Sequence, residues 1–127
     1  MNAILSIKPK YVEEIAAGRK KFEFRKNFFS RPVEKVYVYA TAPISRIVGE
    51  FRPALMLAGS PWDIWRFTDY YTGMTKQEFD EYYKGRELAY AILIDFYKKY
   101  KHPVCLPKGM RAPQSYCYLD PNSKFIL

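Results

Sequence analysis

Four residues with the spacing Gly18-x-Lys20-x-x-Glu23-x-Arg25 carry the side chains in this sequence that are best placed for chemistry. Gly18 follows a short helical pattern, at the position where a left-handed helix cap is expected. Lys20 should therefore follow a turn of defined conformation. In the strand that follows, alternation puts Glu23 and Arg25 on one face and two phenylalanines on the other. The charged row is therefore either the solvated face of a half-buried strand or the wall of a binding cleft.

The three charged residues of this motif suit a phosphate- or nucleoside-like ligand. Lys20 can hold a phosphate oxygen as a point charge, and Arg25 can bind one in bidentate fashion. Glu23 should stay ionised between the two cations. It can accept a hydrogen bond from an exocyclic amine or a ribose hydroxyl, or it can orient the cations. In an enzyme, Lys20 would act as nucleophile or base and Glu23 or Glu50 as proton carrier.

Aromatic residues make up 18% of the chain, with 12 Tyr and 9 Phe, and some of them can stack on bases. Such stacking contributes about 1–3 kcal/mol per base, although most of these rings must fill the core. Tyr39 and Tyr116 are favoured as ligand contacts because they lie beside turns. The full set of stacking candidates is Phe28, Phe29, Tyr39, Trp62, Trp65 and Tyr116.

The elements that must position these residues alternate between types. Alternating segments predict strands at residues 3–7, 21–25, 35–40, 46–57 and 88–97, with two short strands at 104–106 and 115–119. Capping and periodicity predict helices at residues 9–17, 61–67 and 76–84. Pro53 should force an edge or a bulge in its strand. Strands outnumber the clustered helices, so we expect an α+β fold, a small mixed barrel of five to seven strands with helices over one side.

The net charge of +8 is unevenly distributed along the chain. Residues 1–35 hold nine Lys and Arg against four Asp and Glu, and residues 96–127 hold six against one, whereas the middle is slightly acidic. If the two ends meet in one sheet, their charges combine into a basic surface that attracts RNA, DNA or nucleotides. A basic surface of this kind can alternatively dock an acidic protein.

Length and composition exclude several other classes. With 127 residues, we expect one domain spanning residues 1–127. No apolar run is long enough to cross a bilayer, and the opening segment is too short for a signal peptide, so a cytoplasmic protein that binds no membrane is expected. Cys105, Cys117 and His102 do not make a zinc set. We expect the cysteines to be buried, His102 to be an exposed loop residue, and no metal or cofactor to be bound.

The motif residues resemble the ASCH domain family, and the resemblance covers nearly the whole chain. It implies a PUA-like β-barrel with a cleft between barrel and helices, and RNA binding. Several segments are similar to the small stand-alone members of the family, which are described as predicted transcriptional regulators. The segments that carry the resemblance are Gly18-x-Lys20-x-x-Glu23-x-Arg25, Ser6-Ile7-Lys8-Pro9, Tyr39-Ala40-Thr41-x-Pro43, Ile47-Val48-Gly49-Glu50-Phe51 and Pro113-Gln114-Ser115-Tyr116.

The resemblance also implies two hydrolytic activities. Some ASCH proteins are similar to amidohydrolases that act on an acylated cytidine nucleoside with a Lys, Thr and Glu set, and others are linked to ribonuclease activity. The lysine of that set corresponds to Lys20, but its threonine corresponds to Glu23, and its acid falls near Thr72, where no carboxylate stands. Two of the three positions depart from the pattern.

Three functions therefore stay open. They are an RNA- or nucleotide-binding module with a regulatory use, a hydrolase or ribonuclease with Lys20 and Glu23 as catalytic residues, and a protein-docking module. In a PUA-like barrel, we expect the chemically capable residues to converge on one concave surface. The predicted ligand-binding residues are Lys8, Lys20, Glu23 and Arg25 on its walls, Tyr39, Thr41 and Ser115 at its rim, and Tyr116 beside them.

Overall fold

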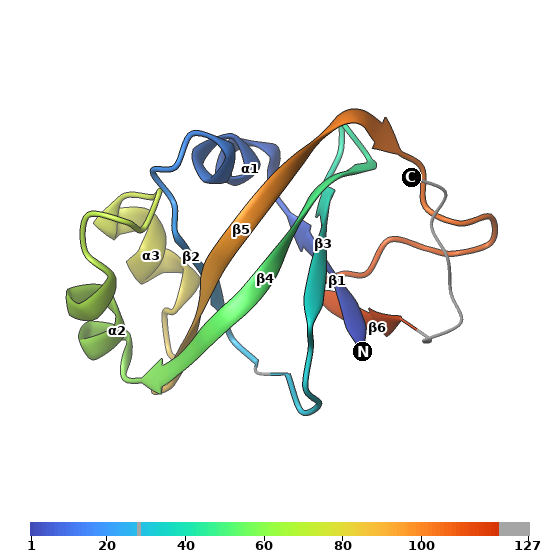
Figure 1. The fold of residues 1–127 in the computed structure, drawn as a ribbon. Helices are drawn as coiled ribbons and strands as arrows, with labels where there is room; N and C mark the ends of the chain where they lie inside the picture. Colours follow the sequence, from blue (N-terminus) through green and yellow to red (C-terminus); the bar gives the residue numbers. More distant parts are fainter. Residues whose placement is uncertain (28, 120–127) are drawn as a thin grey trace.

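A computed structural model describes residues 1–27 and 29–119 and shows a strongly curled sheet with three helices (Figure 1). The helices α1 and α3 lie beside β2 on one side of the sheet, and α2 follows the end of β4. The elements are β1 (Asn2–Ile7), α1 (Pro9–Ala16), β2 (Phe22–Arg25), β3 (Lys35–Ala40), β4 (Arg46–Gly59), α2 (Pro61–Thr68), α3 (Lys76–Tyr82), β5 (Ala89–Val104) and β6 (Tyr116–Leu119).

The sheet has six strands in the order β2-β5-β4-β3-β1-β6. The β1 and β3 strands are parallel, and the other neighbouring pairs are antiparallel. The first and last strands lie side by side, with Leu5 opposite Tyr116, so the two ends of the described chain meet in one sheet. This architecture is an α+β, PUA-like half-barrel, which confirms the expected fold class.

Local sequence signals explain where the helices begin. At α2, the Ser60 side chain accepts a hydrogen bond from the Asp63 backbone N–H at 3.1 Å, and Pro61 occupies the first helical turn. At α3, Thr75 and Glu78 form a reciprocal capping box. The three helices of the structure begin and end within two residues of the predicted bounds, which confirms the prediction.

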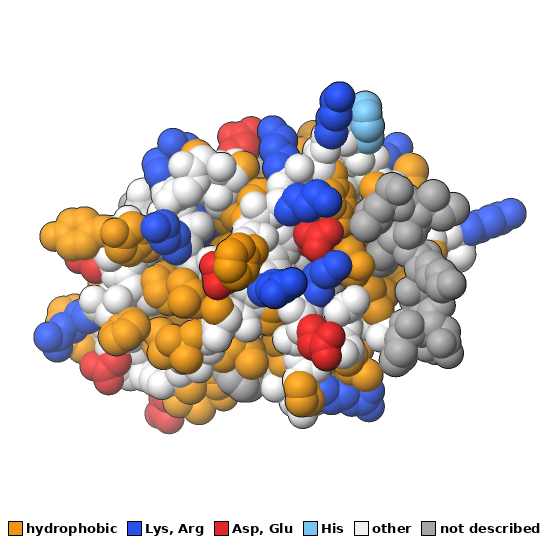
Figure 2. Space-filling view, in the orientation of Figure 1, with side chains coloured by type: hydrophobic (Ala, Val, Ile, Leu, Met, Phe, Trp, Pro, Cys, Tyr) orange, Lys and Arg blue, Asp and Glu red, His pale blue; other side chains and the backbone are white. Residues whose placement is uncertain are grey.

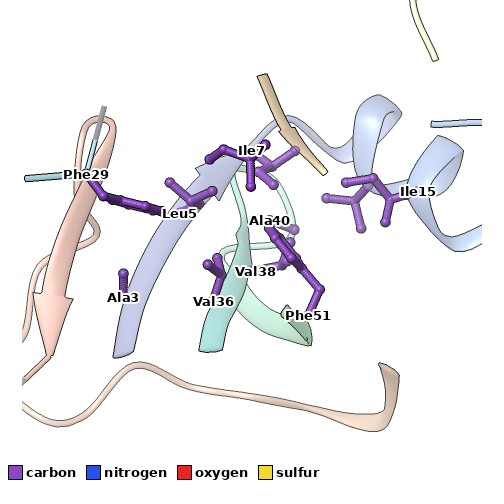
Figure 3. Packing of buried hydrophobic residues seen from close by; sticks show 11 residues of the cluster. Ala3, Leu5, Ile7, Ile15, Phe29, Val36, Val38, Ala40 and Phe51 are labelled. Carbon is purple, nitrogen blue, oxygen red and sulfur yellow. The ribbon is translucent and has the colours of Figure 1, made fainter. Parts of the chain in front are cut away.

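The main core fills the hollow of the curled sheet. Leu5 and Ile7 of β1 lie in the same cluster as Val36 and Val38 of the neighbouring strand β3, and Phe51 of β4 packs with them (Figure 3). All five side chains are almost fully buried. This alternation of inward-facing residues fixes the register of the central strands, and so fixes where each strand ends.

A second core cluster holds α3 against β2. Phe24 and Phe79 pack edge to face with ring centroids 5.1 Å apart, and Phe79 packs in the same way on Tyr83. The Tyr83 hydroxyl donates a hydrogen bond to the backbone carbonyl of Arg25 at 2.8 Å. The strand that carries Glu23 and Arg25 is therefore fixed in position by α3.

The strand predicted at 88–97 is much longer in the structure. The β5 strand continues to Val104, which lies opposite Ile47 of β4, so the separate strand predicted at 104–106 is wrong. At Phe96 the backbone of β5 is irregular, with a positive φ of 51°. Pairing with β4 resumes after this residue, so the strand continues. On β4, the register shifts between Pro53 and Leu55, which confirms the predicted bulge.

Three residues lie elsewhere than the sequence predicted. Cys105 is exposed and Cys117 is half-buried, so the expectation of two buried cysteines is wrong. His102 is exposed, as expected, but it lies within β5 and not in a loop. Among the described residues, no helix is long and apolar enough to cross a membrane, and no group of three potential metal ligands occurs.

Candidate functional site

A cleft of about 680 Å³ opens between α1, β2, α3 and the segment before β6. Its size is that of a typical small-ligand site. It collects residues from segments that are far apart in the sequence, including the ends of β1 and β3. The residues that line it are Ser6, Ile7, Lys8, Tyr11, Glu23, Phe24, Arg25, Lys26, Asn27, Thr41, Met74, Glu78, Glu81, Tyr82, Gln114 and Ser115.

Glu23 and Arg25 form the most buried charged pair in the cleft wall among the described residues. Glu23 Oε1 lies 3.8 Å from Arg25 Nη1, and each side chain is only 10% exposed. This separation is an ion pair but is too long for a direct hydrogen bond. Glu23 Oε2 is buried and has no hydrogen-bond partner among the described residues. The carboxylate therefore retains unused acceptor capacity.

The segment before β6 is tied to both walls of the cleft. Arg25 Nη2 donates a hydrogen bond to the Ser115 hydroxyl, across the gap between the edge strand β2 and the start of β6. The Ser6 backbone N–H donates to the Ser115 carbonyl at 3.0 Å, and the Ser6 hydroxyl donates to the Pro113 carbonyl at 2.6 Å. These bonds hold the guanidinium of Arg25 in a fixed orientation.

Lys20 lies beneath the cleft and does not line it. Its side chain is fully buried, and Nζ donates a hydrogen bond to the Thr72 carbonyl at 2.8 Å. Nζ also lies 4.6 Å from the ring centroid of Phe24 and 5.3 Å from that of Tyr11. Burial lowers the pKa of the Lys20 ammonium, and the negative charge of Glu23 opposes this change. The geometry makes Lys20 an internal anchor for the turn that joins α2 to α3.

A hydrogen-bonded bridge between α1 and α3 forms one side of the cleft. Tyr11 and Lys10 of α1 each donate to Glu78 Oε2 of α3 at 2.6 Å. The hydrogen bonds from Lys10 and then from Tyr11 lower the pKa of Glu78 to about 2. Partial burial and the bond to Glu78 raise the pKa of the Tyr11 hydroxyl. Glu78 therefore stays ionised at neutral and mildly acidic pH.

The bridge predicts how stability depends on pH. Because the pKa of Glu78 is lower in the folded chain than its ordinary value of 4.5, its contribution is present above pH 4.5 and is lost as pH falls toward 2. Wild-type protein should thus lose more unfolding free energy than Glu78→Gln between these two pH values. Urea unfolding of both proteins at pH 6 and pH 3 measures the difference. Parallel losses in both proteins would contradict the bridge.

The structure brings five of the predicted ligand residues together and separates the other three. Lys8, Glu23, Arg25, Thr41 and Ser115 line the cleft. Lys20 lies beneath the cleft wall, as described above.

The predicted aromatic contacts are placed differently. Tyr39 is buried in a core cluster with Ile4 and Ile47, and Tyr116 packs edge to face on Phe29, so neither lines the cleft. The remaining stacking candidates also lie outside the cleft lining. Phe29 is buried in the main core, Trp62 is exposed, Trp65 packs on Phe79, and Phe28 lies outside the described residues.

Sequence reasoning missed the aromatic and helical part of the cleft. Tyr11 and Tyr82 line it, together with Lys26, Glu78 and Glu81. Tyr11 and Tyr82 each lie on the inward side of a helical pattern, where a core position is the usual interpretation. Because α1 and α3 flank the open side of β2, these two rings meet the cleft instead. The capping box located Glu78 but gave no sign of its contacts with α1.

The cleft is balanced in charge among its described residues, which differs from the expected basic site. Lys8, Arg25 and Lys26 face three carboxylates, those of Glu23, Glu78 and Glu81. Basic and acidic side chains are also interspersed over the face of β4 and β5, with no continuous basic surface there (Figure 2). Although the first and last described strands pair in the sheet, the cations that line the cleft all come from residues 1–35, and none of the described cations of residues 96–119 lines it.

Segments similar to this sequence occur in proteins of different kinds. No family model matches the sequence. Over 89 residues, the chain is 33% identical to the large ribosomal subunit protein uL22 of Ureaplasma parvum, a match that covers 68% of this chain and 29% of that protein. The chain thus spans less than a third of the length of that relative.

Two further matches come from Zymomonas mobilis. Over 93 residues, the chain is 26% identical to an ASCH domain-containing ribonuclease, and the match covers 72% of this chain and 63% of that protein. The crystal structure of ASCH from the same organism superimposes with a TM-score of 0.86 at 23% identity, and covers 94% of this chain and 88% of that one. The structural likeness shows the same fold.

Proposed function

Because this chain belongs to the ASCH family, we propose that it is an RNA-binding module, with the cleft beside β2 as the binding site and a regulatory use of that binding. The cleft has the volume of a nucleotide-sized ligand and is lined by two tyrosine rings that can contact a base. The single observation that carries the proposal is the Glu23–Arg25 pair in its wall, which sets a fixed donor beside an acceptor with unused capacity.

Ribonuclease activity is the second candidate, and the relative named as an ASCH domain-containing ribonuclease favours it. Cleavage of RNA needs a group that removes a proton from the attacking hydroxyl. Glu23 is a carboxylate in the cleft wall that could accept this proton. Lys20 lies beneath the wall with its Nζ bonded to Thr72, so in this geometry it cannot touch a bound substrate.

Titration of a fluorescent single-stranded RNA at two salt concentrations tests the binding function. Replacing Arg25 by Ala should weaken binding by about 10- to 100-fold, since a hydrogen bond from a charged group contributes about 1.5–3 kcal/mol. Lys101→Ala is the matched control, because Lys101 is an exposed cation of β5 that does not line the cleft. Because Lys101→Ala removes only a distant positive charge, it should weaken binding slightly at the low salt concentration and not at the high one.

Two further measurements complete this test. Thermal unfolding of Arg25→Ala shows whether a loss of binding reflects a loss of fold. Ser115→Ala removes the hydroxyl that accepts the hydrogen bond from Arg25 and leaves the charge of Arg25 in place. Equal affinity in wild-type protein and Arg25→Ala would place RNA outside the cleft. A denaturing gel of the same RNA shows whether it is cut, and Glu23→Gln should abolish any cutting that depends on the cleft.

A further inference from the structure

We propose that the part of RNA that enters the cleft is a single uncharged nucleobase carrying an exocyclic amino group, with Glu23 as the residue that selects it. The phosphates of the strand stay outside the cleft. This inference rests on the proposed RNA binding and deepens it, because it names the portion of the strand that is recognised and the residue that discriminates among bases.

The charge balance of the cleft argues for a neutral occupant. Three cationic side chains line it, and the same number of carboxylates oppose them. A phosphate placed among these groups would gain attraction from Arg25 but would lie close to the carboxylate of Glu23, whereas Glu78 is already paired with Lys10. A neutral ring with hydrogen-bonding edges meets no such penalty.

The state of Glu23 argues for a ligand that donates hydrogen bonds. Its side chain is nine-tenths buried, and Oε2 is unpartnered among the described residues. Leaving a buried charged acceptor without a donor costs several kcal/mol at most sites, so native structures rarely do it. Tyr11 and Tyr83 direct their hydroxyl hydrogens to Glu78 and to the backbone carbonyl of Arg25. Lys20 donates one of its three hydrogens to the Thr72 carbonyl, and none of them forms a hydrogen bond to Oε2. The missing donor is therefore expected to come from the ligand.

Arg25 adds a donor at a fixed place beside this acceptor. Its bond to Ser115 orients the guanidinium, and its Nη1 lies 3.8 Å from Glu23 Oε1. The pair therefore offers an acceptor and a donor side by side, with the pattern that matches an amino group next to a ring nitrogen or a carbonyl. Adenine, cytosine and guanine each present such an edge in single-stranded RNA.

Uracil fits this pair less well. Its N3–H can bond to one oxygen of Glu23 while one carbonyl accepts from Arg25. The second carbonyl, on the other side of N3–H, then lies beside the second oxygen of the Glu23 carboxylate. The repulsion between these oxygens offsets the single hydrogen bond that uracil can donate. Discrimination by one well-placed pair is typically worth about 1–3 kcal/mol.

The test uses four RNA oligomers of about nine nucleotides that differ only at the central base. One is all uridine, and the others carry adenosine, cytidine or guanosine at the centre, so that the phosphate charge is constant. Competition against a fluorescent RNA should show that at least one amino-bearing oligomer binds wild-type protein about tenfold more tightly than the all-uridine oligomer. Equal affinities for all four would overturn the inference and leave the RNA-binding function standing. Failure of all four to bind would overturn both.

Glu23→Gln assigns the preference to its residue. The amide is nearly isosteric but can turn a donor toward a carbonyl, so the four affinities should converge to within about twofold. A purely structural role of Glu23 would lower all four affinities by one factor and leave their ratio intact, which would overturn the assignment. Glu13→Gln makes the same chemical change on an exposed position of α1 outside the cleft and should keep the wild-type ratio.

Discussion

Gly73→Ala should lower the unfolding free energy by roughly 2–5 kcal/mol, a loss that combines backbone strain with overpacking. Gly73 has a φ of +62°, which disfavours any residue with a Cβ atom. A Cβ built at this position would lie 2.3 Å from Lys20 Cβ and 2.8 Å from Lys20 Cγ. Since the Lys20 side chain is fully buried, it cannot move away without breaking its bond to Thr72. Urea unfolding measures the loss.

Gly85→Ala is the matched control for this prediction. Gly85 has a similar φ of +77°, but a Cβ there would meet no atom within 4 Å. It should therefore cost only the strain of the left-handed backbone, about 1–2 kcal/mol. Equal losses for the two variants would mean that the close packing of Gly73 on Lys20 contributes nothing.

Much of the fold was predictable because its signals are local. The caps at Ser60 and Thr75, the proline at position 9 and the strict alternation in residues 35–40 each determine an element through neighbouring residues. The length of β5 was not predictable in this way. Its last residues are exposed and include Pro103, and only pairing with β4 keeps them extended.

The candidate site shows the same division. Alternation placed Glu23 and Arg25 on one face of a strand, and both line the cleft. Alternation could not reveal that Lys20 is buried, because its cover is Gly73 and Thr72, which are more than fifty positions away in the sequence. Tyr11 had the pattern of a core residue, and only the position of α1 beside an edge strand makes its ring part of a cleft. The family motif thus includes two residues of the cleft wall, Glu23 and Arg25, together with Lys20, which is buried beneath it.

Lys20→Met should lower the unfolding free energy by roughly 1–3 kcal/mol at neutral pH, since the buried Thr72 carbonyl loses its donor. Methionine fills nearly the same space, and the loss of a buried charge offsets part of the cost. Lys20→Ala adds a cavity and should cost more, about 3–5 kcal/mol. Comparison of the two variants separates the hydrogen bond from the packing. If Lys20→Met were as stable as wild-type protein, the bond to Thr72 would not be an anchor.

The same variant distinguishes an anchor from a ligand contact. Burial lowers the pKa of Lys20 below its ordinary value of 10.5, so between the lowered value and 10.5 the unfolded chain binds more protons than the folded chain. The stability of wild-type protein should therefore rise with pH, relative to Lys20→Met, as pH approaches 10.5. For RNA, an anchor beneath the cleft predicts that Lys20→Met keeps the wild-type salt dependence of binding. A decrease corresponding to about one phosphate contact would instead show that Lys20 reaches the RNA, and would return it to the ligand-binding residues.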